Sequence, residues 1–436
     1  MLDIKLIREN PEEIKGKIAR KGAEPALVDD ILDLDKRRRD LTVKIEDLQS
    51  KLNKLSKDVV ALHGQQKIDV INEASSISEK IKQLKPEVEK TNVEYKKTLY
   101  MIPNIPSDDT PDGPDESGNV PVKKVGEPRK FDFTPKEHWQ LGEELDVIDI
   151  ARATKVSGSR FNYLKGKLAL LEFALIQYAY SVLTDEEKLK EIAGKAGIKD
   201  VNIKPFVPIV PPVFIKPEPF EKMARIEPRE ERYYLPNDDL FLIGSAEHTL
   251  GSMHMDETIS EKEFPIRYAG FSPAFRREAG SYGKDMKGIM RVHQFDKLEL
   301  ESFTIPEDSV KEQDFIVAIQ EYLIGSLGLP YQVVKICTGD MGTPDFRQID
   351  IETWMPGQNC YRETNTSDLN TDYQSRRLNT RVKKEGKTEF VHMNDATAYA
   401  IGRTLIAIME NYQQKDGSIE IPEVLKKYTG FDVIKK

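Results

Sequence analysis

Apolar residues recur every three or four positions between Leu27 and Leu62, and this repeat restricts the fold more than any other feature of the chain. Such spacing is typical of the seam of a long helix that packs against another helix. Only Arg38 interrupts it, and we expect this side chain to extend to solvent. The seam residues are Leu27, Ile31, Leu34, Leu41, Ile45, Leu48, Leu52, Leu55, Val59 and Leu62.

The same spacing resumes after His63-Gly64, a pair that can turn the chain, and ends at Pro103. We therefore predict an antiparallel coiled-coil hairpin over about 27–101. At 1.5 Å per residue each limb is roughly 50 Å long, too long to lie wholly against a compact domain. The hairpin should project, with a kink at Pro86 in its second limb. The second seam consists of Ala74, Ile77, Ile81, Leu84, Val88, Thr91 and Tyr95.

The first limb is basic, although the whole chain has a formal net charge of −9. Between Lys36 and Lys57, eight Lys or Arg residues outnumber three acids. Two interpretations stay open, a protein-binding coiled coil or an arm that grips a phosphate backbone, because charged outer positions occur in any coiled coil.

Composition limits the class of protein. A chain of 436 residues can form two or three domains. Its two cysteines, Cys337 and Cys360, can build neither a disulfide framework nor a four-cysteine zinc site. The first residues lack the apolar run of a signal peptide, and no apolar segment approaches the roughly 20 residues that span a bilayer. We expect a cytoplasmic protein without a membrane partner.

Residues 101–130 are crowded with Pro, Gly and Asp, which predicts an interdomain connection. A short acidic helix, a turn around Ser157 to Ser159 and a longer core helix from about Leu168 should follow. From Val201 onward short strand-like runs dominate, and most have no helix between them. This pattern favours an antiparallel sheet over a Rossmann fold. The segment DATAYAIGRTLIAIMENYQQ is predicted to be one long helix with Arg403 in its middle.

The stretch from Phe275 to Glu301 is predicted to form two strands joined by a Gly- and charge-rich loop. There is no Walker loop, so side chains must contact any phosphates. Arginine guanidinia suit a phosphate or carboxylate, Phe295 can stack on a base, and Glu299 can hold an ammonium. These groups suggest a nucleotide and an amino acid held side by side. The alternative is a solvated hairpin with surface ion pairs.

Several blocks, taken together and in order, resemble the seryl-tRNA synthetases of the bacterial and eukaryotic type, which are class II aminoacyl-tRNA synthetases. The blocks are KVSGSRFNYLKG, AEHTL, FRREAGS, GIMRVHQFDKLEL, CTGDMG, WMPGQNCYRE, DYQSRRLNTR and GRTLIAIMENYQ. The resemblance implies an α+β fold with a helical coiled-coil arm and a catalytic domain on a mixed, mainly antiparallel sheet flanked by helices. It places a tRNA-binding domain at 1–106, a linker at 107–130 and the catalytic domain at 131–436.

The resemblance also implies a reaction and its residues. Serine and ATP would form seryl-AMP, and serine would then pass to the 3′ end of tRNA(Ser), with Mg²⁺ and without zinc. Arg276 and Arg403 would be catalytic, and Glu363 and Thr366 would hold Mg²⁺. ATP would contact Arg276, Glu278, Arg291, Phe295, Glu363, Thr366 and Arg403. Serine would contact Ser245, Glu247, Arg276, Glu299 and Thr397. The tRNA would contact Arg37, Arg38, Arg39, Lys44, Lys51 and Lys54.

The family forms homodimers in which the arm works in trans, and the strand around Phe206 to Val213 resembles its interface. Two other functions are weighed, a paralogue that loads a carrier protein and a degenerate RNA- or protein-binding module. Paralogues of that kind lack the arm.

Two positions depart from the family pattern. Ser245 stands where the family usually has Thr, and Asp395 where it often has Asn. An N-cap of the final helix is the favoured explanation for Asp395. Asp350 and Glu352 should share one sheet face, with their role left open. We expect His293 to pack or orient the adenine pocket, and Arg277, Lys284, Asp285 and Lys287 to meet the tRNA acceptor end.

Overall fold

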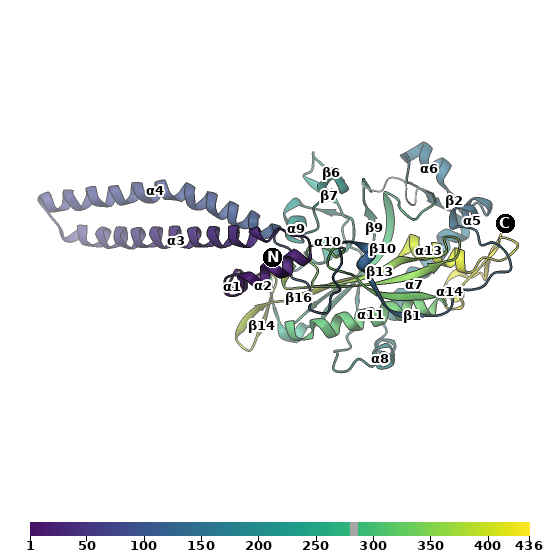
Figure 1. Cartoon of the computed structure of the whole chain (residues 1–436). Coiled ribbons are helices and arrows are strands. Elements are labelled where there is room, and N and C mark those ends of the chain that lie inside the picture. The colour runs from purple at the N-terminus through teal and green to yellow at the C-terminus, as the bar shows by residue number, and fades with distance from the viewer. Residues whose placement is uncertain (280–286) are drawn as a thin grey trace. The chain divides into compact units, whose positions relative to one another are not determined.

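Two long helices, α3 (Ala26–Asp58) and α4 (Gly64–Met101), form the predicted antiparallel hairpin (Figure 1). The chain reverses through a short 3-10 helix, η1 (Val59–Ala61), and Gly64, whose φ of +60° suits glycine. Helices α1 (Ile4–Glu9) and α2 (Pro11–Arg20) contact the start of α3. This computed structural model describes residues 1–279 and 287–436, in two compact units, Met1–Ile105 and Pro106–Lys436.

The apolar seam residues of the hairpin are buried or half-buried, and Leu41, Ile77 and Ile81 are each less than a tenth exposed. Helix α4 continues through Pro86, and its ribbon bends in Figure 1. Arg38 differs from the expectation. Its guanidinium does not extend freely to solvent, because it lies 4.3 Å from the Tyr95 ring centroid and pairs with Asp35. The seam therefore accepts a cation by cation–π contact.

The larger unit is built on an eight-stranded sheet in the order β1-β11-β12-β13-β16-β10-β9-β4. All neighbouring strands are antiparallel except β4 and β9, so the predicted mixed, mainly antiparallel sheet is confirmed. In sheet order the strands are β1 (Val120–Val125), β11 (Tyr331–Lys335), β12 (Arg347–Met355), β13 (Cys360–Thr371), β16 (His392–Ala400), β10 (Gln294–Thr304), β9 (Ile266–Phe275) and β4 (Val207–Ile209).

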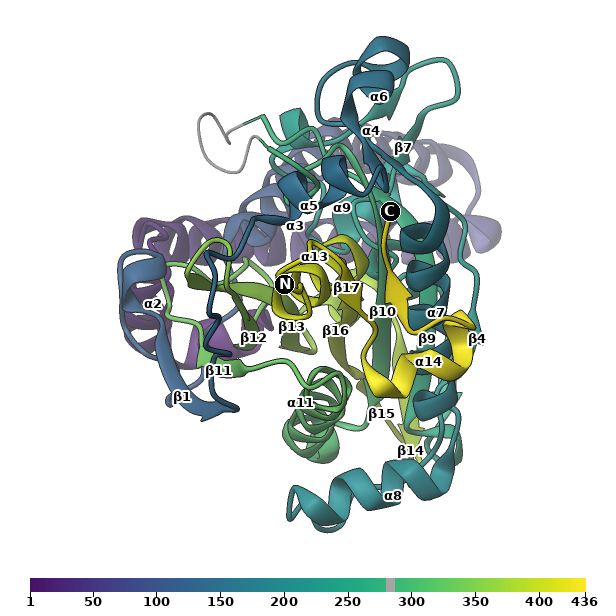
Figure 2. The ribbon, with the colours of Figure 1, turned by 90° about the vertical axis from the view of Figure 1, so that its right-hand side faces the viewer.

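Helices α7 (Gly166–Leu183), α8 (Glu186–Lys195), α11 (Ser309–Ser326), α13 (Ile401–Asn411) and α14 (Glu423–Thr429) share one large apolar core with the sheet (Figure 2). The core residues of β10, such as Leu298 and Leu300, alternate with polar residues on the opposite face. The smaller helices α5 (His138–Glu144) and α6 (Ile150–Ser157) precede α7.

Three sequence-based expectations are corrected here. Strand β1 lies inside the segment expected to be a free connection and pairs with β11 at the sheet edge. Helix α11 was not predicted, because buried polar residues such as Gln313 and Gln320 interrupt its apolar surface. The amide nitrogens of these glutamines donate to backbone carbonyls of neighbouring strands, which satisfies their donor groups.

The third correction concerns the final helix. Residues up to Ala400 belong to the central strand β16, and α13 begins only at Ile401. Burial between β13 and β10 outweighs the helix propensity of the alanines there. Arg403 consequently lies in the first turn of α13 and not in its middle. Among the described residues, no helix has the length and apolar character needed to cross a bilayer.

Candidate active site

A cleft of about 860 Å³ opens on the polar face of the central strands. Strand β10 contributes Phe295, Lys297 and Glu299, and the neighbouring strands β16 and β13 contribute residues at matching heights. Arg276 and Glu278, which follow β9, and the start of α13 also line the cleft. A site on adjacent strands of one sheet is held by the ladder hydrogen bonds, which makes its geometry rigid.

The structure brings the predicted residues together. Ten of the eleven proposed for ATP or serine line this cleft: Glu247, Arg276, Glu278, Arg291, Phe295, Glu299, Glu363, Thr366, Thr397 and Arg403. Ser245 is buried directly beside it, where its hydroxyl oxygen accepts a 3.2 Å hydrogen bond from Lys297 Nζ.

One end of the cleft combines an aromatic ring with fixed cations. The Arg276 guanidinium lies 5.4 Å from the Phe295 ring centroid and donates to the Gly244 carbonyl. His293 fixes the Arg276 backbone, because the Arg276 N–H donates to the His293 carbonyl and the His293 ring lies 3.1 Å from the Arg276 carbonyl. His293 therefore orients the backbone at Arg276, and its role toward adenine stays a prediction. This end suits a planar base next to a phosphate.

Glu278 and Arg291 form an ion pair of 3.3 Å at the same end. Glu278 adopts a left-handed φ of +51°, and Arg160 donates to its carbonyl at 2.8 Å. The Arg160 carbonyl in turn accepts from the His293 N–H. Arg160 comes from the KVSGSR block, which is distant in the sequence. Its two hydrogen bonds connect that block to Glu278 and His293. Sequence reasoning had not assigned it a role.

In the same cleft, Arg403 Nη1 lies 3.1 Å from Glu363 Oε1 and donates to the Glu363 carbonyl at 2.9 Å. Burial acts to raise the pKa of Glu363, but the charges of Arg403 and Arg276 outweigh it and lower that pKa. Glu363 is thus held as a carboxylate inside the cleft.

Asp350 lies close to Glu363 of this ion pair. The Thr366 hydroxyl donates to its carboxyl at 2.8 Å, while burial and the charge of Glu363 raise the pKa of Asp350. Glu352 instead accepts from Gln332 Nε2 at 2.6 Å. The two acids therefore have different partners, although their spacing predicted one shared sheet face.

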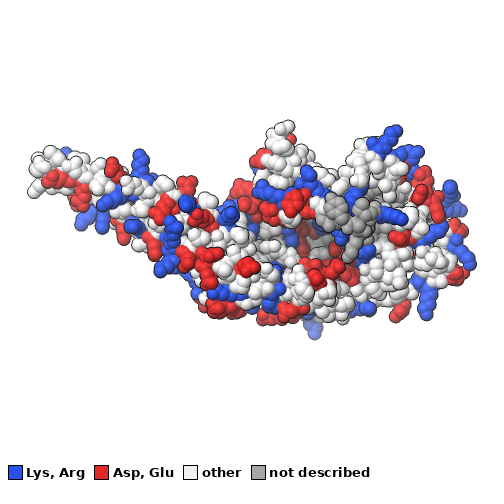
Figure 3. Space-filling model, turned by 45° about the horizontal axis from the view of Figure 1, so that its top comes forward, with Lys and Arg blue, Asp and Glu red and all other residues white. Residues whose placement is uncertain are grey.

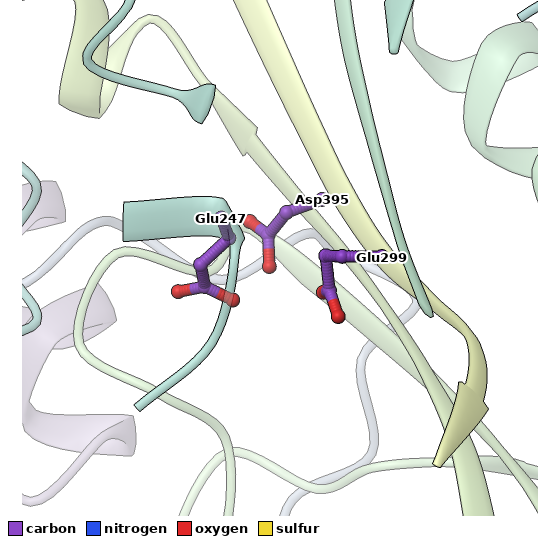
Figure 4. Close-up of side chains that lie close together, drawn as sticks. All are labelled: Glu247, Glu299 and Asp395. Atoms are coloured by element: carbon purple, nitrogen blue, oxygen red, sulfur yellow. The ribbon is translucent and has the colours of Figure 1, made fainter. Parts of the chain in front are cut away.

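The third part of the cleft is acidic. The carboxyl groups of Glu247, Glu299 and Asp395 point toward one another (Figure 4), and each offers an oxygen within 4.8 Å of the others. Lys297 Nζ lies 2.6 Å from Glu299 Oε2. Burial and the charge of Glu247 raise the pKa of Glu299 to about 7, although Lys297 acts in the opposite direction. Such a pocket suits an ammonium group that brings a compensating charge.

Asp395 is not an N-cap, which corrects the favoured explanation. It lies within β16, is 2% exposed, and its carboxyl contacts Asn370 Nδ2 at 2.5 Å and Arg225 Nη2 at 3.3 Å. Glu247 begins the short helix α10 (Glu247–Leu250), although strand-like runs were expected to dominate from Val201 onward. Arg225 and Lys297 were both missed. Only the strand period could have placed Lys297 in the cleft, two residues before Glu299.

The charged residues near the hairpin loop have separate surroundings. The Arg277 guanidinium lies 4.9 Å from the Tyr233 ring centroid and donates to the Arg232 carbonyl. Lys287 Nζ lies 4.4 Å from the Trp139 ring centroid. Lys284 and Asp285 lie outside the described residues.

The basic limb of the hairpin carries two kinds of cation. Arg37 pairs with Glu87 at 3.0 Å, and Arg39 pairs with the buried Asp35 at 3.0 Å, as Arg38 does at 3.7 Å. Lys44, Lys51 and Lys54 are exposed. Figure 3 shows Lys and Arg side chains interspersed with acidic side chains along the hairpin.

A mainly antiparallel sheet with one arginine after strand β9 and another in helix α13, both lining one cleft, is the core of a class II aminoacyl-tRNA synthetase. Residues 232–412 match the sequence profile described as the tRNA synthetase class II core domain (G, H, P, S and T). Residues 1–106 match the seryl-tRNA synthetase N-terminal domain. The chain belongs to the seryl-tRNA synthetase family, as its relatives establish.

The serine-tRNA ligases of Thermotoga petrophila and Thermotoga maritima are each 43% identical to this chain, and the matches cover 100% of both partners. Among solved structures, seryl-tRNA synthetase from Pyrococcus horikoshii complexed with ATP has a TM-score of 0.89 and 37% identity, covering 100% of this chain and 99% of that one. Cytoplasmic serine-tRNA ligase from Naegleria fowleri in complex with AMP has a TM-score of 0.85 and 32% identity over the same shares.

Proposed function

We propose that this chain is an ATP-dependent serine-tRNA ligase that forms seryl-AMP and then charges tRNA(Ser). One observation carries the proposal. Arg276 lies 5.4 Å from the Phe295 ring centroid, and its charge also acts on the carboxyl groups of Glu299 and Glu363, so one guanidinium can hold both the α-phosphate of ATP and the carboxylate of serine. The reaction needs those two groups adjacent.

For ATP, we assign adenine to the Phe295 ring, with Glu278 reading its amino group and Arg403 over the opposite face and near the γ-phosphate. Arg276 and Arg291 would contact phosphate oxygens. The ion pairs Glu278–Arg291 and Glu363–Arg403 hold these side chains before a nucleotide arrives. Preorganised cations reduce the reorganisation needed as charge develops on the phosphate.

For serine, Glu299 and Glu247 would take the α-ammonium, and Ser245 and Thr397 would complete the pocket around the hydroxyl. All of these side chains are buried, each less than a tenth exposed. Alanine would leave their polar atoms unpaired, and discrimination of that kind is worth several kcal/mol. The absent methyl of Ser245 widens the pocket only slightly.

The chemistry follows from positioning. A serine carboxylate oxygen attacks the α-phosphorus, the bond to the β-phosphate oxygen breaks, and pyrophosphate leaves. A ribose hydroxyl at the tRNA 3′ end then attacks the seryl carbonyl, and AMP leaves. Neither step needs a protein nucleophile, so alignment and charge stabilisation by Arg276 and Arg403 can account for catalysis.

The donor set at the phosphate end fits Mg²⁺. Glu363 is a buried carboxylate, Thr366 offers a hydroxyl, and the carboxyl of Asp350 adjoins that hydroxyl. Hard oxygen ligands of this kind are those that Mg²⁺ prefers. When bound, the ion would neutralise phosphate charge. The absence of zinc stays a prediction.

The arm provides the contact with tRNA. We assign phosphate contacts to Arg37, Arg38, Arg39, Lys44, Lys51 and Lys54, on a limb that contributes more cations than acids. The same arm argues against a paralogue that loads a carrier protein. The residues that the resemblance assigns to ATP and serine are all present in or beside the cleft, which argues against a degenerate binding module.

We also propose a homodimer and a cytoplasmic location. Strand β4 ends the sheet, and Val207 and Val210 near it are 51% and 87% exposed. An apolar sheet edge of this kind is typical of a subunit interface. Replacing Val210 by Asp should lower the apparent mass in sedimentation, and an unchanged mass would place the interface elsewhere.

An amino-acid panel in the ATP-pyrophosphate exchange assay tests the function. We expect exchange with serine alone, and its loss in Glu299→Ala while calorimetry still detects ATP binding. Exchange with a different amino acid would refute the serine assignment. If the chain does not bind ATP, the proposal that it is an ATP-dependent enzyme is refuted.

A further inference from the structure

Arg225 is the centre of an ion-pair network below the acidic part of the cleft. It lies shortly after helix α9 (Pro217–Lys222), and its side chain is 16% exposed. Its Nε lies 2.6 Å from Glu247 Oε1, and its Nη2 lies 3.3 to 3.4 Å from Asp345, Asp368 and Asp395. The four acids come from α10, the loop before β12, β13 and β16. One side chain thus connects four separate segments.

The acids beneath Arg225 form a row across the sheet. Asp368 and Asp395 are register partners on β13 and β16, and Glu301 is the partner of Asp395 on β10. Their residues are 6%, 2% and 0% exposed. Neither carboxyl oxygen of Glu301 has a hydrogen-bond partner among the described residues. Burial raises the pKa of each of the three acids.

Such a row is unstable without a cation. Carboxyl groups desolvated side by side repel one another when ionised, and a buried charge without a partner is strongly unfavourable. Lys297 does not replace Arg225, because it contacts Glu299 and Ser245 instead. Arg225 therefore fixes the positions of Glu247 and Asp395, two of the three carboxyl groups that face one another in the acidic pocket.

We propose that Arg225 is a specificity-determining positioning residue, which sets the floor of the amino-acid pocket by holding Glu247 and Asp395. This inference rests on the proposed function and deepens it. Glu247 held in place confronts the ammonium, and Asp395 held in place offers an acceptor to the substrate hydroxyl. An amino acid without that hydroxyl leaves a desolvated carboxyl unpaired.

The arrangement also explains why a carboxylate is tolerated at position 395, where an amide is frequent in the family. Arg225 and Asn370 Nδ2 both donate to Asp395 and compensate its charge, while Oδ1, which accepts from Arg225, keeps a second lone pair for the substrate hydroxyl. Asp395 and Arg225 therefore form a matched pair, and the effect of substituting one should depend on whether the other is present.

The test measures serine and ATP dependence of pyrophosphate exchange for three variants. Arg225→Met removes the cation, and we expect the KM for serine to rise by about tenfold or more, with the KM for ATP within about twofold. The preference for serine over alanine should fall by a similar factor. Arg225→Lys keeps the charge but loses the planar fork, so its KM for serine should lie between the two.

The double variant Arg225→Met with Asp395→Asn removes one acid together with the cation, and it should recover part of the loss. The matched control is Arg229→Met, because Arg229 is 61% exposed at its side chain and pairs with Glu227. This control should leave both KM values unchanged.

Unchanged serine KM in both Arg225 variants would overturn the inference, as would an equal rise in the KM values for serine and ATP. If Arg225→Met does not fold, Arg225→Lys and the double variant decide by the same criteria. The proposed function is judged separately, on the wild-type chain. Should that chain exchange with another amino acid, the variants are compared with that amino acid.

Discussion

Arg403 contacts Glu363 at two groups, the Glu363 carboxylate at 3.1 Å and the Glu363 carbonyl at 2.9 Å. Arg403 thus joins the first turn of α13 to strand β13. The contact orders a cation and an anion at the phosphate end of the cleft. Replacing Glu363 by Gln removes the anion while keeping the shape. We expect the Mg²⁺ concentration for half-maximal exchange to rise by about tenfold, because an anionic oxygen ligand is lost. An unchanged Mg²⁺ requirement would exclude Glu363 as a ligand.

The pKa of Glu299 predicts a pH dependence of serine use. With a pKa of about 7, this carboxyl is mostly protonated at pH 6 and mostly ionised at pH 8. The serine ammonium needs the ionised form, so kcat/KM for serine in the exchange assay should increase about tenfold between those values. The KM for ATP serves as the control and should change little. A flat serine profile would contradict the assignment of Glu299.

Removing the end of the hairpin should separate the two half-reactions. Arg37 and Glu87 face each other at 3.0 Å, which marks matched positions on the two limbs. Replacing residues 38–86 by a short glycine turn should leave serine-dependent exchange intact and abolish tRNA charging. The melting temperature of the larger unit provides the folding control. Equal loss of both activities would mean that the arm supports the fold.

The exposed lysines of the first limb predict a salt effect. Changing Lys44, Lys51 and Lys54 together to Ala should lower the slope of log affinity for tRNA against log salt concentration by about 2 to 3, since each phosphate contact contributes close to 0.9. Exchange without tRNA should not change. A slope equal to that of the wild type would mean that these lysines do not contact the tRNA phosphates.

Lys287 offers a test close to the reaction. Its ammonium lies over the Trp139 ring, outside the ion pairs of the cleft. Lys287→Glu should impair transfer to tRNA more than serine activation, by about tenfold if one phosphate contact becomes a repulsion. Lys287→Met separates loss of charge from its reversal. A matching decrease in exchange and charging would contradict a role in tRNA contact.

Features that depend on local periodicity were predictable from the sequence. The hairpin seam has a repeat of three and four, and the alternation in β10 places Phe295 and Glu299 on one face. The class of fold and most cleft residues followed from these patterns and from the resemblance. Residue identity at each position was sufficient there, because the contacts involve neighbours in the chain or across one hairpin.

Features that depend on distant segments were not predictable. Asp395 lies in an alanine-rich segment whose local propensity favours a helix, yet its place between β13 and β10 makes it a strand. Arg225 occupies a segment without any motif, and its four partners come from four other parts of the chain. Nothing in its local sequence indicates that these acids meet.

The length of the α3–α4 hairpin can change in fixed steps. Its seam positions repeat every seven residues, so one heptad added to each limb beyond α1 and α2 would lengthen it by about 10 Å and keep the seam pattern. Its reach is therefore a stepwise quantity that can be altered without touching the chemistry. A series of such lengthened and shortened chains would show how far tRNA recognition tolerates a change of span.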